Sequence, residues 1–103
     1  MKFEYPYEVS RDDARVRLEA LGEYLYNRHG IKVTWSDGDK ARFSGKYLLV
    51  TIDGELTIED GKVHFSGKDP GMLLRKRAVN YLKDKLATYL NPATAPEDLP
   101  RNG

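Results

Sequence analysis

The chain has 103 residues and a formal net charge of +1, from 17 basic and 16 acidic side chains. This length suits one small domain, and the balanced charge gives no general attraction to nucleic acid or to a membrane surface. The chain has no cysteine, which excludes disulfides, thiolate metal sites and cysteine nucleophiles. No apolar run approaches the roughly 20 residues of a membrane span, and the N-terminus does not resemble a signal peptide. We therefore expect a cytoplasmic protein.

The first predicted element is a strand over residues 2–9, where apolar and charged or polar residues alternate. Pro6 lies inside it, and proline cannot donate a hydrogen bond to a sheet interior, so we predict an edge strand.

A helix is predicted over Arg11 to His29. Ser10, with Asp13 three residues later, forms a variant of the capping box, and Gly30 is a typical residue after a helix end. Apolar residues spaced by three or four predict one buried stripe: Ala14, Leu18, Leu21 and Leu25. Arg17 and other charged residues lie off that stripe.

Four further strands follow, because apolar and polar residues alternate within each of four segments, at residues 31–35, 41–43, 48–58 and 63–65. Residues 36–39 form the first turn, so Trp35 and Phe43 are expected to be inward-facing neighbours across it. The alternation from Leu48 to Ile58 is the most regular in the chain. Asp60-Gly61 then predicts a tight hairpin.

A second amphipathic helix is predicted over about residues 72–90, with an apolar stripe that we expect to face the sheet: Met72, Val79, Leu82, Leu86 and Leu90. Residues 91–103 contain three prolines and few large apolar residues, so we predict a disordered tail after a single domain of residues 1–90. The fold class is α+β, an antiparallel β-sheet with two amphipathic helices on one face, in the order β-α-β-β-β-β-α.

Few residues are candidates for chemistry. His29 is explained as a helix-terminal residue and His64 as a residue of the polar sheet face, and the carboxylates near Asp37 and Asp53 as turn and solvated-face residues. We therefore predict no catalytic residue, no metal site and no cofactor. The possible contact with an anionic surface is the basic face of the second helix, with Arg75, Lys76 and Lys83.

Several segments together resemble the polyhydroxyalkanoic acid system family, small bacterial proteins encoded near polyester-granule genes. They are Tyr26-Asn27-Arg28-His29-Gly30, Trp35 with Asp37-Gly38-Asp39, Gly54-Glu55-Leu56-Thr57-Ile58, Val63-His64-Phe65-Ser66-Gly67, and Pro70 before Met72-Leu73-Leu74. Family members often carry Pro-His where this chain has Pro6-Tyr7, and Lys-Gly-x-Ile-Glu where it has residues 76–80. The resemblance implies a link to polyhydroxyalkanoate storage and supplies no catalytic residues.

We expect a non-enzymatic accessory protein, associated with polyester granules through their surface or through another granule protein. The alternative is a small module that binds an apolar or acyl ligand between sheet and helices. A third alternative is a nucleic-acid-associated protein that uses the basic helix. A filled core would favour a surface role, and a sizeable apolar cavity would favour ligand binding. The sequence leaves the oligomeric state open.

Overall fold

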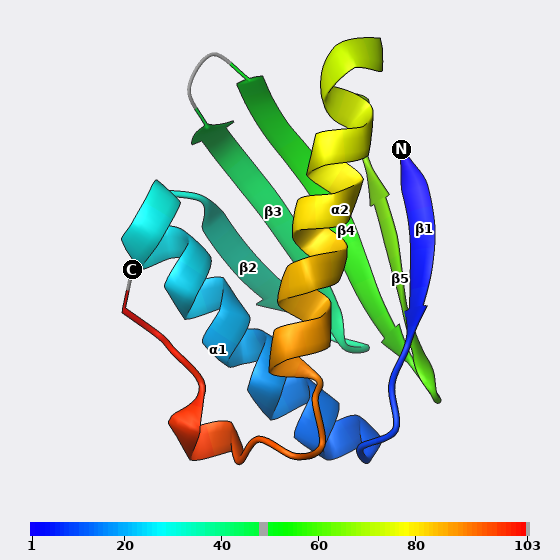
Figure 1. The fold of residues 1–103 in the computed structure, drawn as a ribbon, viewed down its shortest axis with the longest axis vertical. Helices are drawn as coiled ribbons and strands as arrows, with labels where there is room; N and C mark the ends of the chain where they lie inside the picture. The colour runs from blue at the N-terminus through cyan, green and yellow to red at the C-terminus, as the bar shows by residue number, and fades with distance from the viewer. Residues whose placement is uncertain (48–49, 103) are drawn as a thin grey trace.

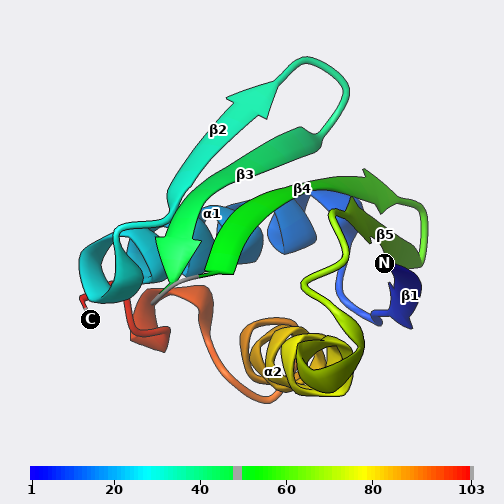
Figure 2. The ribbon, with the colours of Figure 1, turned by 90° about the horizontal axis from the view of Figure 1, so that it is seen from above.

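A computed structural model of the chain describes residues 1–47 and 50–102. It contains one five-stranded antiparallel sheet and two long helices on the same side of it (Figures 1 and 2). The elements are, in chain order, β1 (Lys2–Pro6), α1 (Arg11–His29), β2 (Lys32–Ser36), β3 (Lys40–Tyr47), β4 (Val50–Glu59), β5 (Lys62–Gly67), α2 (Met72–Tyr89) and the short η1 (Pro96–Asp98). The predicted α+β class and element order are confirmed.

The strands lie in the order β1-β5-β4-β3-β2, so the N-terminal strand joins the edge opposite β2. β1 ends at Pro6, three residues earlier than predicted, and its position at the edge agrees with the proline. Gly45, with φ of 154°, stays within β3, where a Cβ atom would lie 3.3 Å from the Cα of Ile31. The predicted alternation at Leu48 lies outside the described residues.

α1 begins and ends where the sequence predicts. The Ser10 side chain accepts a hydrogen bond from the Asp13 amide at 3.1 Å, and Gly30 has the left-handed conformation with φ of 71°. The apolar stripe of the helix faces the sheet, with its closest approach to β2 and β4, and its residues belong to the hydrophobic core.

The two predicted hairpin turns are present. Gly61 has a positive φ in the second turn; in the first, both Gly38 and Asp39 do. Trp35 lies opposite Ala41, not Phe43, whose partner is Val33. Trp35 is half-buried, with the Arg15 guanidinium 4.2 Å from its ring centroid.

α2 packs less closely than its sequence stripe predicts. Leu86 and Tyr89 near its C-terminal end are buried, whereas Met72 at its start is 84% exposed. The N-terminal half of the helix extends past the end of α1 (Figure 1). A hollow remains between this part of the helix and the sheet.

The segment after α2 differs from the predicted disordered tail. It turns back along α1 (Figure 1), and Leu99 within it is buried. The side-chain amide nitrogen of Asn27 donates to the Arg101 carbonyl at 2.8 Å, and the hydroxyl of Tyr89 donates to the Pro100 carbonyl. One buried leucine and these hydrogen bonds hold a segment whose composition alone favours disorder.

Arg17, predicted to lie off the buried stripe, is only 3% exposed because this segment covers it. Its Nη1 atom donates to the carbonyls of Tyr89 at 3.2 Å and Asn91 at 2.9 Å, and its Nε lies 3.1 Å from an Asp13 oxygen. A cation is favoured there because the C-terminal end of a helix carries partial negative charge.

Candidate functional site

A groove of about 470 Å³ lies between α2 and the sheet. This volume lies within the range of small-molecule binding sites. α2 supplies one wall, and β3 and β4 supply the other. Its lining is largely apolar and includes Leu25, Ile31, Phe43, Ile52, Phe65, Leu74, Ala78 and Leu82.

Three features of the sequence keep the groove open. Gly54 and Gly67 face each other in the β4–β5 ladder, and the Phe65 ring lies over both of them. A Cβ atom on Gly54 would lie 2.7 Å from Phe65 Cζ, so any larger residue at position 54 would push the ring away from the sheet and into the groove. On the opposite wall, Ala78 is the small residue that α2 presents to the groove.

One end of the groove carries an aromatic polar cluster of His29, Tyr47 and Tyr81. A hydrogen bond of 3.0 Å joins Nε2 of His29 to the Tyr81 hydroxyl, and the His29 ring packs edge-on against Tyr47 with centroids 4.8 Å apart. Burial, with the positive charges of Arg28 and Lys85, lowers the pKa of His29 below its usual value of 6.5. Burial also raises the pKa of Tyr81, so both groups are held neutral near pH 7.

The rim of the groove is cationic. Arg77 and Lys68 line it, together with the carboxylate-bearing residue Asp53. Asp53 alternates with the inward-facing Ile52, so its side chain belongs to the outer sheet face, where it pairs with Arg42 at 2.8 Å.

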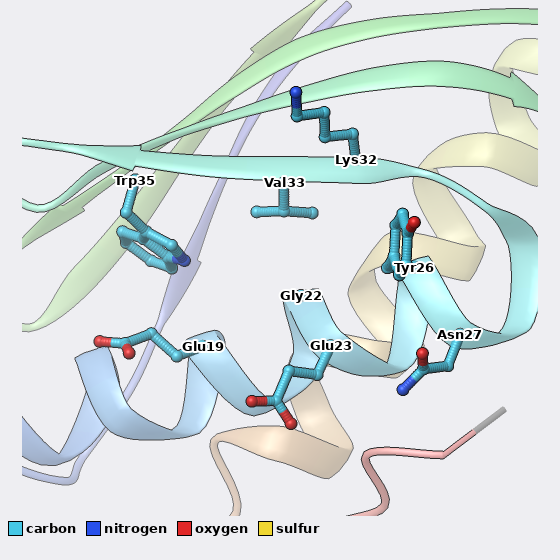
Figure 3. Close-up of a pocket in the computed structure, with 8 residues that line it drawn as sticks. All are labelled: Glu19, Gly22, Glu23, Tyr26, Asn27, Lys32, Val33 and Trp35. Atoms are coloured by element: carbon cyan, nitrogen blue, oxygen red, sulfur yellow. The ribbon is translucent and has the colours of Figure 1, made fainter.

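A second hollow of about 320 Å³ lies between α1 and β2 (Figure 3). Val33 and Trp35 of β2 point toward α1, where Val33 lies over Gly22 and Trp35 lies nearest Glu19. Lys32 points away from the helix. Both carboxylates of this hollow already form ion pairs. Glu19 pairs with Arg15 at 2.8 Å, and Glu23 pairs with Arg101 at 3.2 Å. The acidic side chains of this hollow are therefore already neutralised by arginines.

The contact with an anionic surface stays a prediction, and two of its three residues already have neighbours in the structure. Arg75 pairs with Asp69 at 2.5 Å, and the Lys83 ammonium lies 5.6 Å from the Phe3 ring centroid at the β1 edge. Lys76 is exposed. Arg77, which the sequence analysis did not select, is the basic side chain of α2 that lines the groove.

His29 was predicted only as a helix-terminal residue, and its place in the groove was not predicted. No sequence signal joins residue 29 to residues 47 and 81, because their contact depends on how α2 crosses the sheet. Within residues 1–47 and 50–102 there is no cluster of three metal-ligating side chains and no helix long and apolar enough to cross a membrane.

Fold and groove together define a small open-sheet α+β protein with an apolar pocket beneath its last helix. The model of the family described as "Putative polyhydroxyalkanoic acid system protein" matches residues 1–91. The chain belongs to this family, and the resemblance seen in the sequence is confirmed. No curated protein and no solved structure matches the chain.

Proposed function

We propose that the protein is a non-enzymatic binding module of the polyhydroxyalkanoate system that holds an apolar acyl chain in the groove between α2 and the sheet. The observation that carries the proposal is the groove itself, about 470 Å³ with a mainly aliphatic and aromatic lining. A packed core would have favoured a purely surface role. The hollow instead favours the ligand-binding alternative considered from the sequence.

The chemistry of the lining supports an acyl ligand. Leucine, isoleucine and phenylalanine side chains offer only dispersion contacts and displaced water, which suit methylene chains and not sugars or nucleotides. The family description names polyhydroxyalkanoic acid, whose repeating unit is a hydroxyacyl chain. An aliphatic chain with few polar atoms therefore agrees with both the site and the family, and a place at or near polyester granules is part of this proposal.

The polar groups of the groove support binding in preference to catalysis. His29 contacts Tyr81, but no acidic side chain orients the imidazole from behind within the described residues. A histidine base that activates a nucleophile normally has such an orienting partner. His29 and Tyr81 instead offer hydrogen bonds to an oxygen of the ligand.

The test is binding of the neutral dye Nile red, followed by its displacement with methyl decanoate. Ala78→Trp places a large side chain in the groove, whereas the control Ala87→Trp places it on an exposed position of the same helix that does not line the groove. We expect Ala78→Trp to lower the affinity for both ligands by at least about tenfold, equivalent to about 1.4 kcal/mol, because the indole ring occupies the space that the ligands need. The control should bind like wild type.

Thermal unfolding of each variant is measured in parallel. A folded Ala78→Trp protein that binds as tightly as wild type would contradict the proposal, as would a wild-type protein that binds neither Nile red nor methyl decanoate.

A further inference from the structure

We infer that the acyl ligand of the groove ends in a carboxylate and that Arg77 at the rim binds this carboxylate. The inference rests on the proposed function and deepens it, since it selects a free acid over a neutral ester or the body of a polyester. It is drawn from the charge distribution around the groove, which the apolar lining alone does not determine.

Arg77 differs from most arginines in having no acidic partner within the part of the chain that the structure describes. Within residues 1–47 and 50–102 carboxylates pair with Arg11, Arg15, Arg17, Arg42, Arg75 and Arg101. No such pair includes Arg77, although Asp69 and Asp84 lie on or beside the same helix. Its guanidinium therefore stands at the groove with its donors available.

Among the described residues that line the groove, no carboxylate is free to pair with Arg77. Asp53 is the acidic residue that lines the groove, and its carboxylate is held by Arg42 at 2.8 Å on the outer face of the sheet. Lys68 adds a second positive charge to the lining. The rim consequently favours an anionic ligand. A cationic ligand would meet electrostatic repulsion there.

The neighbours of Arg77 fit an amphiphile. Leu74 precedes it by three residues and Tyr81 follows it by four, so these side chains lie along the same side of the helix, and both line the groove. A guanidinium beside apolar surface binds a carboxylate through two parallel N–H···O bonds, which are stronger where water is partly excluded. The chain of the ligand then lies inside the groove and its charge at the rim.

The experiment compares decanoate with methyl decanoate as competitors of Nile red, at a concentration below micelle formation and at pH 7.5. The two competitors share the chain and differ in the charge. The variants are Arg77→Gln and the matched control Lys76→Gln, which removes one positive charge from an exposed neighbouring position outside the groove.

We expect wild type to bind decanoate about tenfold more tightly than the ester, the equivalent of one charge-assisted hydrogen-bonded contact. Arg77→Gln should abolish this preference while leaving the affinity for methyl decanoate within about twofold, and Arg77→Lys should restore part of it. Lys76→Gln should retain it.

Equal affinities of wild type for acid and ester would overturn the inference and leave the proposed function standing. Preference for the acid that survives Arg77→Gln would also overturn it, because another group would then bind the carboxylate. Failure of both competitors to displace Nile red would instead refute the proposed function, and the inference with it.

Discussion

The contact between Gly54 and Phe65 gives the most direct test of how the sequence keeps the groove open. In Gly54→Ala the new methyl group would lie 2.7 Å from Cζ and 3.2 Å from Cε2 of Phe65. Carbon atoms in good contact are about 3.5–4.0 Å apart, so the ring must move by most of an ångström. It is held by Phe3, stacked at a centroid distance of 5.2 Å, and by Phe43, edge-on at 6.1 Å.

The expected net effect follows from two opposing terms. Gly54 has no positive φ, so alanine is compatible with its backbone and would gain about 0.5–1 kcal/mol from the smaller entropy of the unfolded chain. Forcing a methyl group into a packed contact costs about 1–3 kcal/mol. We expect Gly54→Ala to lower the free energy of unfolding by about 1–2 kcal/mol, and to weaken Nile red binding because the ring is pushed into the groove.

A double-mutant cycle with Phe65→Leu, measured by urea unfolding, separates the clash from any general intolerance of a larger residue. In the Phe65→Leu background, Gly54→Ala should be neutral or slightly stabilising, which gives a coupling energy of about 1–3 kcal/mol. Additive effects of the two substitutions, within about 0.5 kcal/mol, would refute the assignment of Phe65 as the constraint on Gly54.

Two further predictions concern the ends of the helices. Arg17→Met should lower the free energy of unfolding by about 3 kcal/mol in urea, because two carbonyls at the end of α2 lose a charged donor. The control Arg28→Met, at an exposed position, should change it by less than about 0.5 kcal/mol. A loss below about 1 kcal/mol for Arg17→Met would contradict the role of Arg17. The folded state lowers the pKa of His29, so the neutral imidazole favours folding; this stabilisation is complete above about pH 6.5 and is lost as the pH falls from that value toward the lower folded pKa. Thermal melts from pH 8 to pH 5 should therefore show a small acid-dependent loss of stability that is absent in His29→Gln. The same dependence of melting temperature on pH in both proteins would contradict this prediction.

Most of the fold could be predicted because each element has a strong local signal. The three-and-four spacing of leucines, the Ser10 cap and Gly30 specify α1 to the residue. The period of two within the strand segments between Ile31 and Phe65 specifies which residues face the helices. These signals depend on near neighbours in the chain, so the sequence contains them directly.

The groove could not be predicted in the same way. The stripe of α2 indicates which side of the helix faces the sheet, but not how closely the helix approaches it. Arg17 was predicted to lie outside the buried side of α1, because the apolar stripe indicates only the side that faces the sheet. The segment that begins at residue 91 returns and covers another side of α1, which the stripe does not indicate. Arg77 was overlooked among neighbouring basic residues, since only the three-dimensional arrangement shows that Arg75 has a partner and Arg77 does not.

The C-terminal end of α2 is buried more deeply than its N-terminal end. Its C-terminal turns are fixed by Leu86, Tyr89 and the Arg17 hydrogen bonds, while Leu73 near its start is 91% exposed. For an 18-residue helix rising about 1.5 Å per residue, a tilt of about 5° about the C-terminal end moves the N-terminal end by about 2 Å. The width of the groove at the start of α2 is thus sensitive to this one angle. On the proposed function, a small tilt of α2 would admit acyl chains of different bulk and leave the core between α1 and the sheet unchanged.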